Sequence, residues 1–160
     1  MIRARSQPVT SELRAAILEL IASPLYPYLI TTTSRDLPYT RPVICVNDGF
    51  VIRMVTRRGA VKLRHLARNP NASLLWCDAA GTPARSVLLQ GRVEVIDDLA
   101  AVREFAARYA VKNPSRRRGW DASEDTGRVV LELTPTFCRA DWFAGFVPVI
   151  LRPVDLLPNA

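Results

Sequence analysis

Short segments rich in β-branched residues, separated by turn signals, constrain the fold of this chain more than any other feature. The first three are YLITTTS, TRPVICV and FVIRMVT, and RDLP and NDG lie between them. β-Branched side chains fit the pleated surface of a strand, whereas Asp, Asn, Gly and Pro favour tight turns. We therefore expect three antiparallel strands in sequence order. Pro42 cannot donate a ladder hydrogen bond, so the second strand should lie at a sheet edge.

Three further segments have the same character. They are ASLLWC, the long RSVLLQGRVEVI and RVVLELT, the last with Val129, Leu131 and Leu133 on one face. Gly91 inside the long segment predicts a bulge or a close backbone approach, as expected where a sheet curls. The fold class that follows is mainly β (α+β), a small barrel of about six antiparallel strands with flanking helices.

Apolar residues at helical spacing predict three helices, at residues 11–22, in the segment AVKLRHLARNP, and at residues 98–110. Thr10 or Ser11 should cap the first helix, and Pro24 and Pro27 should follow its end. The side chains expected to be buried are Leu13, Ile17, Leu20 and Ile21, then Val61, Leu63, Leu66 and Ala67, then Leu99, Val102, Phe105, Ala106 and Tyr109.

Length and composition fit one domain over residues 1–160 with its own core. No apolar run approaches the roughly 20 residues of a membrane span, and the N-terminal segment does not resemble a secretion signal, so we expect a cytoplasmic protein without a membrane partner. The spacing of Cys45, Cys77 and Cys138 matches no disulfide framework or metal site. We expect three buried, reduced thiols and no bound metal.

The net charge of +7 predicts a surface that attracts anions, such as nucleic acid, anionic lipid or a phosphorylated small molecule. Arg116, Arg117 and Arg118, next to Trp120, could bind nucleic acid through phosphate contacts and stacking. A solvated loop explains this run equally simply, and we favour it. Nucleic acid is therefore not an expected partner.

The segment TRRGAVKLRHLARNP, residues 56–70, is the strongest candidate for a binding site. A strand ends at Thr56, a glycine turn follows, and a helix begins with Lys62 in its first turn. The start of a helix offers unpaired N–H groups and the positive end of its dipole, so a phosphate could bind there with Thr56 and Lys62. The alternative is a solvated basic loop before a packing helix.

Arg41 is a second candidate because it shares a strand face with Val43 and Cys45, and an arginine on an apolar face needs an anionic partner. The alternative is an exposed edge-strand arginine that discourages aggregation. His65 follows Lys62 by three positions and could face the same phosphate, although we favour a solvated or packing histidine.

The order of these features resembles the pyridoxamine 5′-phosphate oxidase-like split barrels. A strand arginine, a strand threonine, Gly-x-x-Lys, Asn-Pro, a SLLW strand and V-x-x-x-G-x-x-E follow one another over residues 29–96, and RVVLELTPTFCRADWFAG is similar to the closing strands. The resemblance implies a homodimer that binds FMN, or the deazaflavin F420, between its subunits.

By this resemblance, Arg41 and Lys62 would hold the cofactor phosphate. Thr56 and the backbone around Val43 and Val55 would border the phosphate and the ring.

Three positions farther along the chain also match cofactor-binding positions. Ser86 stands where the oxidase has a glutamine near the flavin, and Trp142 and Arg152 are spaced like the tryptophan and arginine of the partner subunit. Two departures argue against vitamin B6 oxidation: Val61 replaces an arginine beside the lysine, and GFVPVILRPVD lacks the signature that binds the pyridoxal substrate.

We therefore expect an oxidoreductase that transfers hydride between FMN and a small organic substrate, with no catalytic residue assigned because the cofactor carries the chemistry. One alternative is an F420-dependent reductase of the same fold, whose acidic cofactor tail would suit a basic loop. Another is a non-catalytic module that binds a flavin, haem or nucleic acid.

Overall fold

A computed structural model describes residues 7–116 and 127–157. The expected arginine cluster lies outside the described residues, except for the backbone of Arg116. The elements in chain order are α1 (Ser11–Ala22), β1 (Tyr28–Thr32), β2 (Pro38–Pro42), β3 (Cys45–Asp48), β4 (Val51–Arg57), α2 (Val61–Arg68), β5 (Asn71–Asp78), β6 (Arg85–Ile96), α3 (Leu99–Lys112), a 3-10 turn (Pro114–Arg116), β7 (Arg128–Asp141), β8 (Val149–Leu151) and α4 (Pro153–Leu156).

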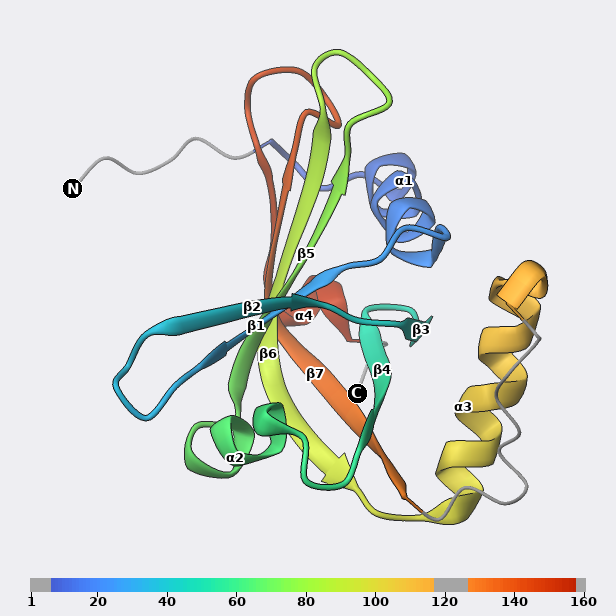
Figure 1. The fold of residues 1–160 in the computed structure, drawn as a ribbon. Helices are drawn as coiled ribbons and strands as arrows, with labels where there is room; N and C mark the ends of the chain where they lie inside the picture. Colours follow the sequence, from blue (N-terminus) through green and yellow to red (C-terminus); the bar gives the residue numbers. More distant parts are fainter. Residues whose placement is uncertain (1–6, 117–126, 158–160) are drawn as a thin grey trace.

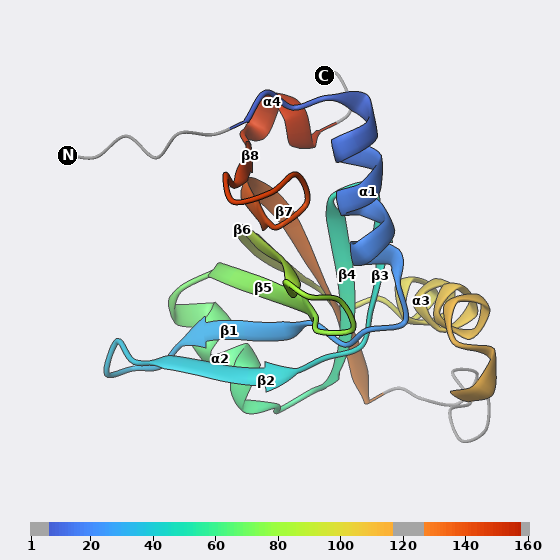
Figure 2. The same cartoon turned by 90° about the horizontal axis from the view of Figure 1, so that it is seen from above.

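The strands form one sheet in the order β2-β1-β5-β6-β7-β4-β3, with β8 paired to β7. Every neighbouring pair in this path is antiparallel. The edge strands β2 and β3 are consecutive in the chain, so the sheet curls until its two edges come together at their short connection (Figure 1, Figure 2). The result is the expected mainly β fold, a split barrel with flanking helices.

The sheet has eight strands rather than about six. The segment TRPVICV is not one strand, because the chain leaves β2 after Pro42 and enters β3 at Cys45 on the opposite edge. The backbone N–H of Val43 donates to the carbonyl of Pro27 at 3.0 Å, outside both strands. The position of Pro42 in an edge strand is confirmed, and β8 is an additional strand that was not predicted.

The predicted helices are present, and Thr10 caps α1 by accepting a hydrogen bond from the N–H of Leu13 at 3.2 Å. Two burial predictions in α2 were wrong: Val61 is 44% exposed and Ala67 is exposed, and only Leu66 is fully buried. This helix has eight residues and covers one end of the barrel, so a single face meets the core. Leu99, the first residue of α3, is also exposed, and the buried face of α3 consists of Val102, Phe105 and Tyr109.

The core has two parts. The larger part fills the barrel around Trp76, Leu74 and Ile52, and α1 covers it. The smaller part lies where α3 packs against the outer side of the sheet, around Phe105 and Val130.

The predicted irregularity at Gly91 is confirmed. Gln90 pairs with Phe137 and Gly91 with Pro135, so Thr136 is the extra residue of a bulge. A Cβ atom at Gly91 would collide with the backbone of Thr134. The close approach of β6 and β7 therefore requires glycine at this position.

Candidate functional site

Arg41 and Lys62 are brought together from different elements at the end of the barrel that α2 covers (Figure 1). Arg41 lies in β2 opposite Leu29 of β1, a core residue, and its side chain reaches the inner face of the barrel. Lys62 lies in the first turn of α2. Burial lowers the pKa of Lys62, and the nearby charge of Arg41 lowers it further. The two cations therefore destabilise each other's charge.

A buried threonine hydroxyl holds each of these cations. Thr31 is 1% exposed and Thr56 is 7% exposed, and they are the only fully buried polar side chains in the described part of the chain. Arg41 donates from Nη2 to Oγ1 of Thr31 at 2.7 Å, and Lys62 donates from Nζ to Oγ1 of Thr56 at 3.0 Å. The hydroxyls fix the positions of both cations without neutralising either.

Arg41 retains unused hydrogen-bonding capacity. Its Nη2 also donates to the carbonyl of Tyr39 at 3.0 Å, and the Tyr39 ring lies 4.3 Å from the guanidinium carbon. Its Nε and Nη1 are buried and have no hydrogen-bond partner. Neither Arg41 nor Lys62 forms an ion pair with any carboxylate of residues 7–116 and 127–157. Two half-buried, uncompensated cations with free donors form a site that suits an anion.

His65 belongs to the same hydrogen-bond network, although it was expected to be a solvated or packing histidine. Its Nδ1 lies 2.9 Å from Oγ1 of Thr31, and its ring meets that of Tyr39 edge to face with 5.6 Å between centroids. Burial lowers the pKa of His65, and the charges of Arg41 and Arg64 lower it further. A packing role alone does not account for this position.

Sequence reasoning missed Thr31 and Tyr39. Thr31 had a readable signal, because it lies two residues after Leu29 and thus on the buried side of β1. A polar residue on the buried side of a strand needs a partner, which here is Arg41. Tyr39 gave no such signal, since Tyr39 and both of its neighbours in β2 are exposed and no buried residue lies beside it in the strand.

Val43 and Val55 lie close to this site along the chain but have other side-chain contacts. Val43 is buried in the barrel core. Val55 points to the opposite side of β4 from Thr56 and packs against the cluster under α3. Any contact with a ligand beside Thr56 would therefore come from the backbone of Val55.

Within one chain, Ser86, Trp142 and Arg152 are not brought to the cations. Ser86 pairs with Asp141 at one end of β7, whereas Thr56 pairs with Val129 at the other end. The loop that starts at Trp142 lies at the top of Figure 1, far from α2. Arg152 follows β8, which also pairs with the distal half of β7.

The loop after β7 has an unusual conformation. Trp142 has a φ of 66°, rare for a non-glycine residue, and packs edge-on against Phe146 with 4.7 Å between ring centroids. Phe146 itself is 88% exposed. Arg152 is exposed and precedes α4, where its backbone N–H donates to Asp155 Oδ2 at 2.9 Å.

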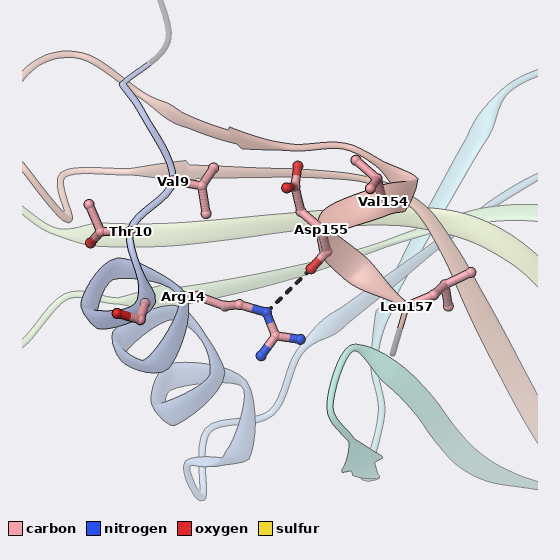
Figure 3. Close-up of a pocket in the computed structure, with 7 residues that line it drawn as sticks. Val9, Thr10, Arg14, Val154, Asp155 and Leu157 are labelled. Atoms are coloured by element: carbon pink, nitrogen blue, oxygen red, sulfur yellow. Dashed lines mark hydrogen bonds between the residues drawn. The ribbon is translucent and has the colours of Figure 1, made fainter. Parts of the chain in front are cut away.

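A separate depression lies between α1 and α4 (Figure 3). Its lining includes Arg14, whose Nε donates to the carbonyl of Asp155 at 3.3 Å and whose guanidinium lies over the Phe50 ring. None of the expected site residues lines it. Arg14 thus joins the first helix to the last, and the depression is separate from the cation site.

Other expectations concern cysteines, metals and membranes. Cys45 and Cys138 are buried, but Cys77 is exposed, because it alternates with the buried Trp76 along β5. In the described ranges, no group of three potential metal ligands comes together. No described helix is long and apolar enough to cross a membrane.

Comparison with known proteins gives a family match and a set of similar folds. The sequence profile of the pyridoxamine 5′-phosphate oxidase family matches residues 13–140. General stress protein 26 from Bacillus anthracis is 20% identical, with a TM-score of 0.69 over 88% of this chain and 98% of that one. No protein of curated function matches this chain significantly by sequence.

Two further solved structures carry names that mention a cofactor. One named F420 reductase is 24% identical, with a TM-score of 0.61 over 75% of this chain and 93% of that one. A haem-binding protein from Mycobacterium smegmatis is 16% identical, with a TM-score of 0.72 over 93% of this chain and 61% of that one. At these identities the likeness shows a shared fold alone.

Proposed function

This chain belongs to the pyridoxamine 5′-phosphate oxidase family, and from that premise we propose that it is an oxidoreductase that transfers hydride between bound FMN and a small organic substrate. The observation that carries the proposal is the convergence of Arg41 and Lys62, each held by a buried threonine and neither paired with a carboxylate. Structural charges inside proteins are normally compensated, so uncompensated ones point to a ligand.

The chemistry of these donors fits a phosphate group. A phosphate dianion accepts several charge-assisted hydrogen bonds, and the free donors of Arg41 and the ammonium of Lys62 can supply them. Burial lowers the pKa of Lys62 and the charge of Arg41 lowers it further, and a bound anion would oppose both effects. The groups present therefore suit the phosphate end of FMN.

In this proposal the side chains of the protein bind and orient the cofactor and do not take part in the hydride transfer. FMN supplies the hydride chemistry when bound, and the protein supplies binding and orientation. Arg41 and Lys62 bind the phosphate, Thr31 and Thr56 fix the two cations, and α2 covers this end of the barrel. No side chain is assigned an acid or base role.

Members of this family are typically dimers that bind flavin-type cofactors, which supports a dimer for this chain. Ser86, Trp142 and Arg152 lie too far along β7 to reach the cations of their own chain. We propose that they contact FMN bound to a second copy, in a cytoplasmic homodimer.

Two alternatives have specific support. The neighbour named F420 reductase makes F420 the alternative cofactor, because the same two cations would suit its phosphate. The neighbour named haem-binding protein raises the alternative of a non-catalytic carrier or sensor. Vitamin B6 oxidation is not proposed, since GFVPVILRPVD replaces the substrate-binding signature.

A binding experiment tests the proposal. The absorbance spectrum of the purified protein is recorded first, and the protein is then titrated with FMN, F420 and haem. FMN binding with turnover of an electron donor supports the oxidoreductase. Selective F420 binding moves the assignment to a deazaflavin enzyme, haem binding without turnover to the carrier, and no binding of any of them overturns the cofactor proposal.

Lys62→Ala should weaken FMN binding by at least about tenfold, because one charge-assisted hydrogen bond to the phosphate is lost. The matched control is Arg64→Ala, which removes an exposed positive charge from the same helix. Flavin fluorescence quenching measures both affinities. Equal effects of the two substitutions would show that Lys62 acts only through the general surface charge.

A further inference from the structure

His65 is the only histidine of the chain, and it is linked to the cation site through Thr31. Its Nδ1 lies 2.9 Å from the Thr31 hydroxyl oxygen, which lies 2.7 Å from Nη2 of Arg41. His65 is thus one side chain away from Arg41. Family membership assigns no role to this histidine, and Lys62 and Arg41 bind phosphate without touching it.

The hydrogen-bond donors and acceptors of this network accommodate both a neutral and a protonated His65. Arg41 can only donate, so the Thr31 hydroxyl accepts from it. The single proton of that hydroxyl is then free to be donated to Nδ1 of a neutral His65 that carries its own proton on Nε2, and the second lone pair of the hydroxyl is free to accept from a protonated Nδ1.

The charges around His65 favour the neutral state. Thr31 faces it from β1, and Tyr39 and Arg41 face it from β2. On α2, Arg64 adds positive charge, and Lys62 lies one turn before His65.

Arg68, one turn after His65, is largely compensated. It pairs with Asp36 at 3.1 Å and donates to the carbonyl of Thr33 at 2.6 Å. With the anion site free, the net field at the imidazole is positive and opposes its protonation.

We propose that filling the Arg41–Lys62 site with a phosphate dianion drives uptake of one proton by His65, so that the histidine becomes a third positive charge of the site. The inference rests on the proposed anion site. A dianion bound at Arg41 reverses the sign of the field at His65. The proton comes from solvent, and protonated Nδ1 donates to the Thr31 hydroxyl, which has a second lone pair for it.

Proton uptake by His65 would make ligand binding depend on pH. The ligand raises the His65 pKa, so binding is strengthened below the pKa of the free protein. This gain is lost as the pH rises through the pKa of the complex. A nearby opposite charge shifts a pKa by about one unit or more, and one unit corresponds to about a tenfold change in affinity.

A proton NMR titration reads this shift directly, since one histidine gives one imidazole C2 signal. The His65 pKa is measured for the free protein, with FMN and with riboflavin, which lacks the phosphate. We expect FMN to raise it by at least about one unit and riboflavin to leave it unchanged.

Two variants separate titration from structure. His65→Asn places an amide near the position of Nδ1 but cannot titrate, so the affinity should lose about a tenfold pH dependence while the phosphate's own titration remains. Thr31→Val removes the linking hydroxyl and should reduce the pKa shift, whereas Thr31→Ser should preserve it. Circular dichroism checks that each variant is folded.

The outcomes of the test distinguish the two proposals. If neither FMN nor F420 binds, the proposed anion site fails. If FMN binds, Lys62→Ala weakens it and the His65 pKa does not move, the anion site stands and the proton-uptake proposal is overturned.

Discussion

Threonine hydroxyls, rather than carboxylates, bind the two cations of the site, so the positive charges are not compensated. A carboxylate beside Arg41 or Lys62 would compensate the charge and remove the demand for a ligand. A hydroxyl accepts one hydrogen bond and orients the cation while leaving its charge intact. Thr31 and Thr56 thus leave two positive charges uncompensated at the proposed anion site.

The three cysteines should differ sharply in reactivity. Burial raises the pKa of Cys138 to about 12 and also raises that of Cys45, so both remain protonated near pH 8. Cys77 is exposed. We expect a thiol reagent to modify one cysteine in the folded protein at about pH 8 and all three after unfolding, as counted by mass spectrometry. Rapid modification of a second thiol without unfolding would contradict the burial of Cys45 and Cys138.

At the scale of single residues, the side chains that could bind an anion were easier to predict than their proximity in the folded chain. Arg41, Thr56 and Lys62 were selected from residue type and sequence order, but their contact depends on how β2 and α2 meet at the end of the barrel. The residue pattern within each segment does not show which distant segments come together in the fold. The hydrogen bond between His65 and Thr31 was not predicted, because the two residues are 34 positions apart in the sequence.

At the scale of elements, the bulge of β7 opposite Gly91 of β6 allows the sheet to bend. Gly91→Ala should lower the free energy of unfolding by about 1–3 kcal/mol, because the added methyl collides with the Thr134 carbonyl and the backbone must shift. Urea denaturation measures the change. Gly81→Ala is the matched control, since its new Cβ would meet only the Pro83 carbonyl at 3.8 Å, an ordinary contact. Equal stability of the two variants would mean that β7 moves aside at little cost.

The elements show what periodicity can and cannot predict. α1 and α3 follow from apolar spacing because each buries a full face over at least 12 residues. α2 has only one fully buried residue, Leu66, and its apolar spacing wrongly predicted that Val61 would also be buried. The division of TRPVICV into β2 and β3 was not predictable, since it depends on the meeting of two distant sheet edges.

At the scale of the whole molecule, the two groups of expected cofactor residues lie toward opposite ends of β7. Arg41, Thr56 and Lys62 lie at the end covered by α2, and Ser86 and Trp142 lie at the other. One copy therefore cannot assemble all of them around one ligand. Two copies related by a two-fold axis can form two equal sites, each with one group from either chain.

Mixing two defective variants tests this arrangement. Lys62→Ala and Arg152→Ala homodimers should each bind FMN weakly, because every site lacks one contact. If Arg152 acts across the interface, a mixed dimer has one intact site and one site that lacks both contacts. Random association of equal amounts should then restore about a quarter of the tight sites of the original protein.

Refolding the two variants together and titrating with FMN measures this fraction, and each variant refolded alone is the control. If Arg152 served the site of its own chain, every site in the mixture would remain defective and no tight binding would return. Normal binding by Arg152→Ala alone would instead remove Arg152 from the site. Recovery of tight binding only in the mixture requires a dimer whose two copies share each site.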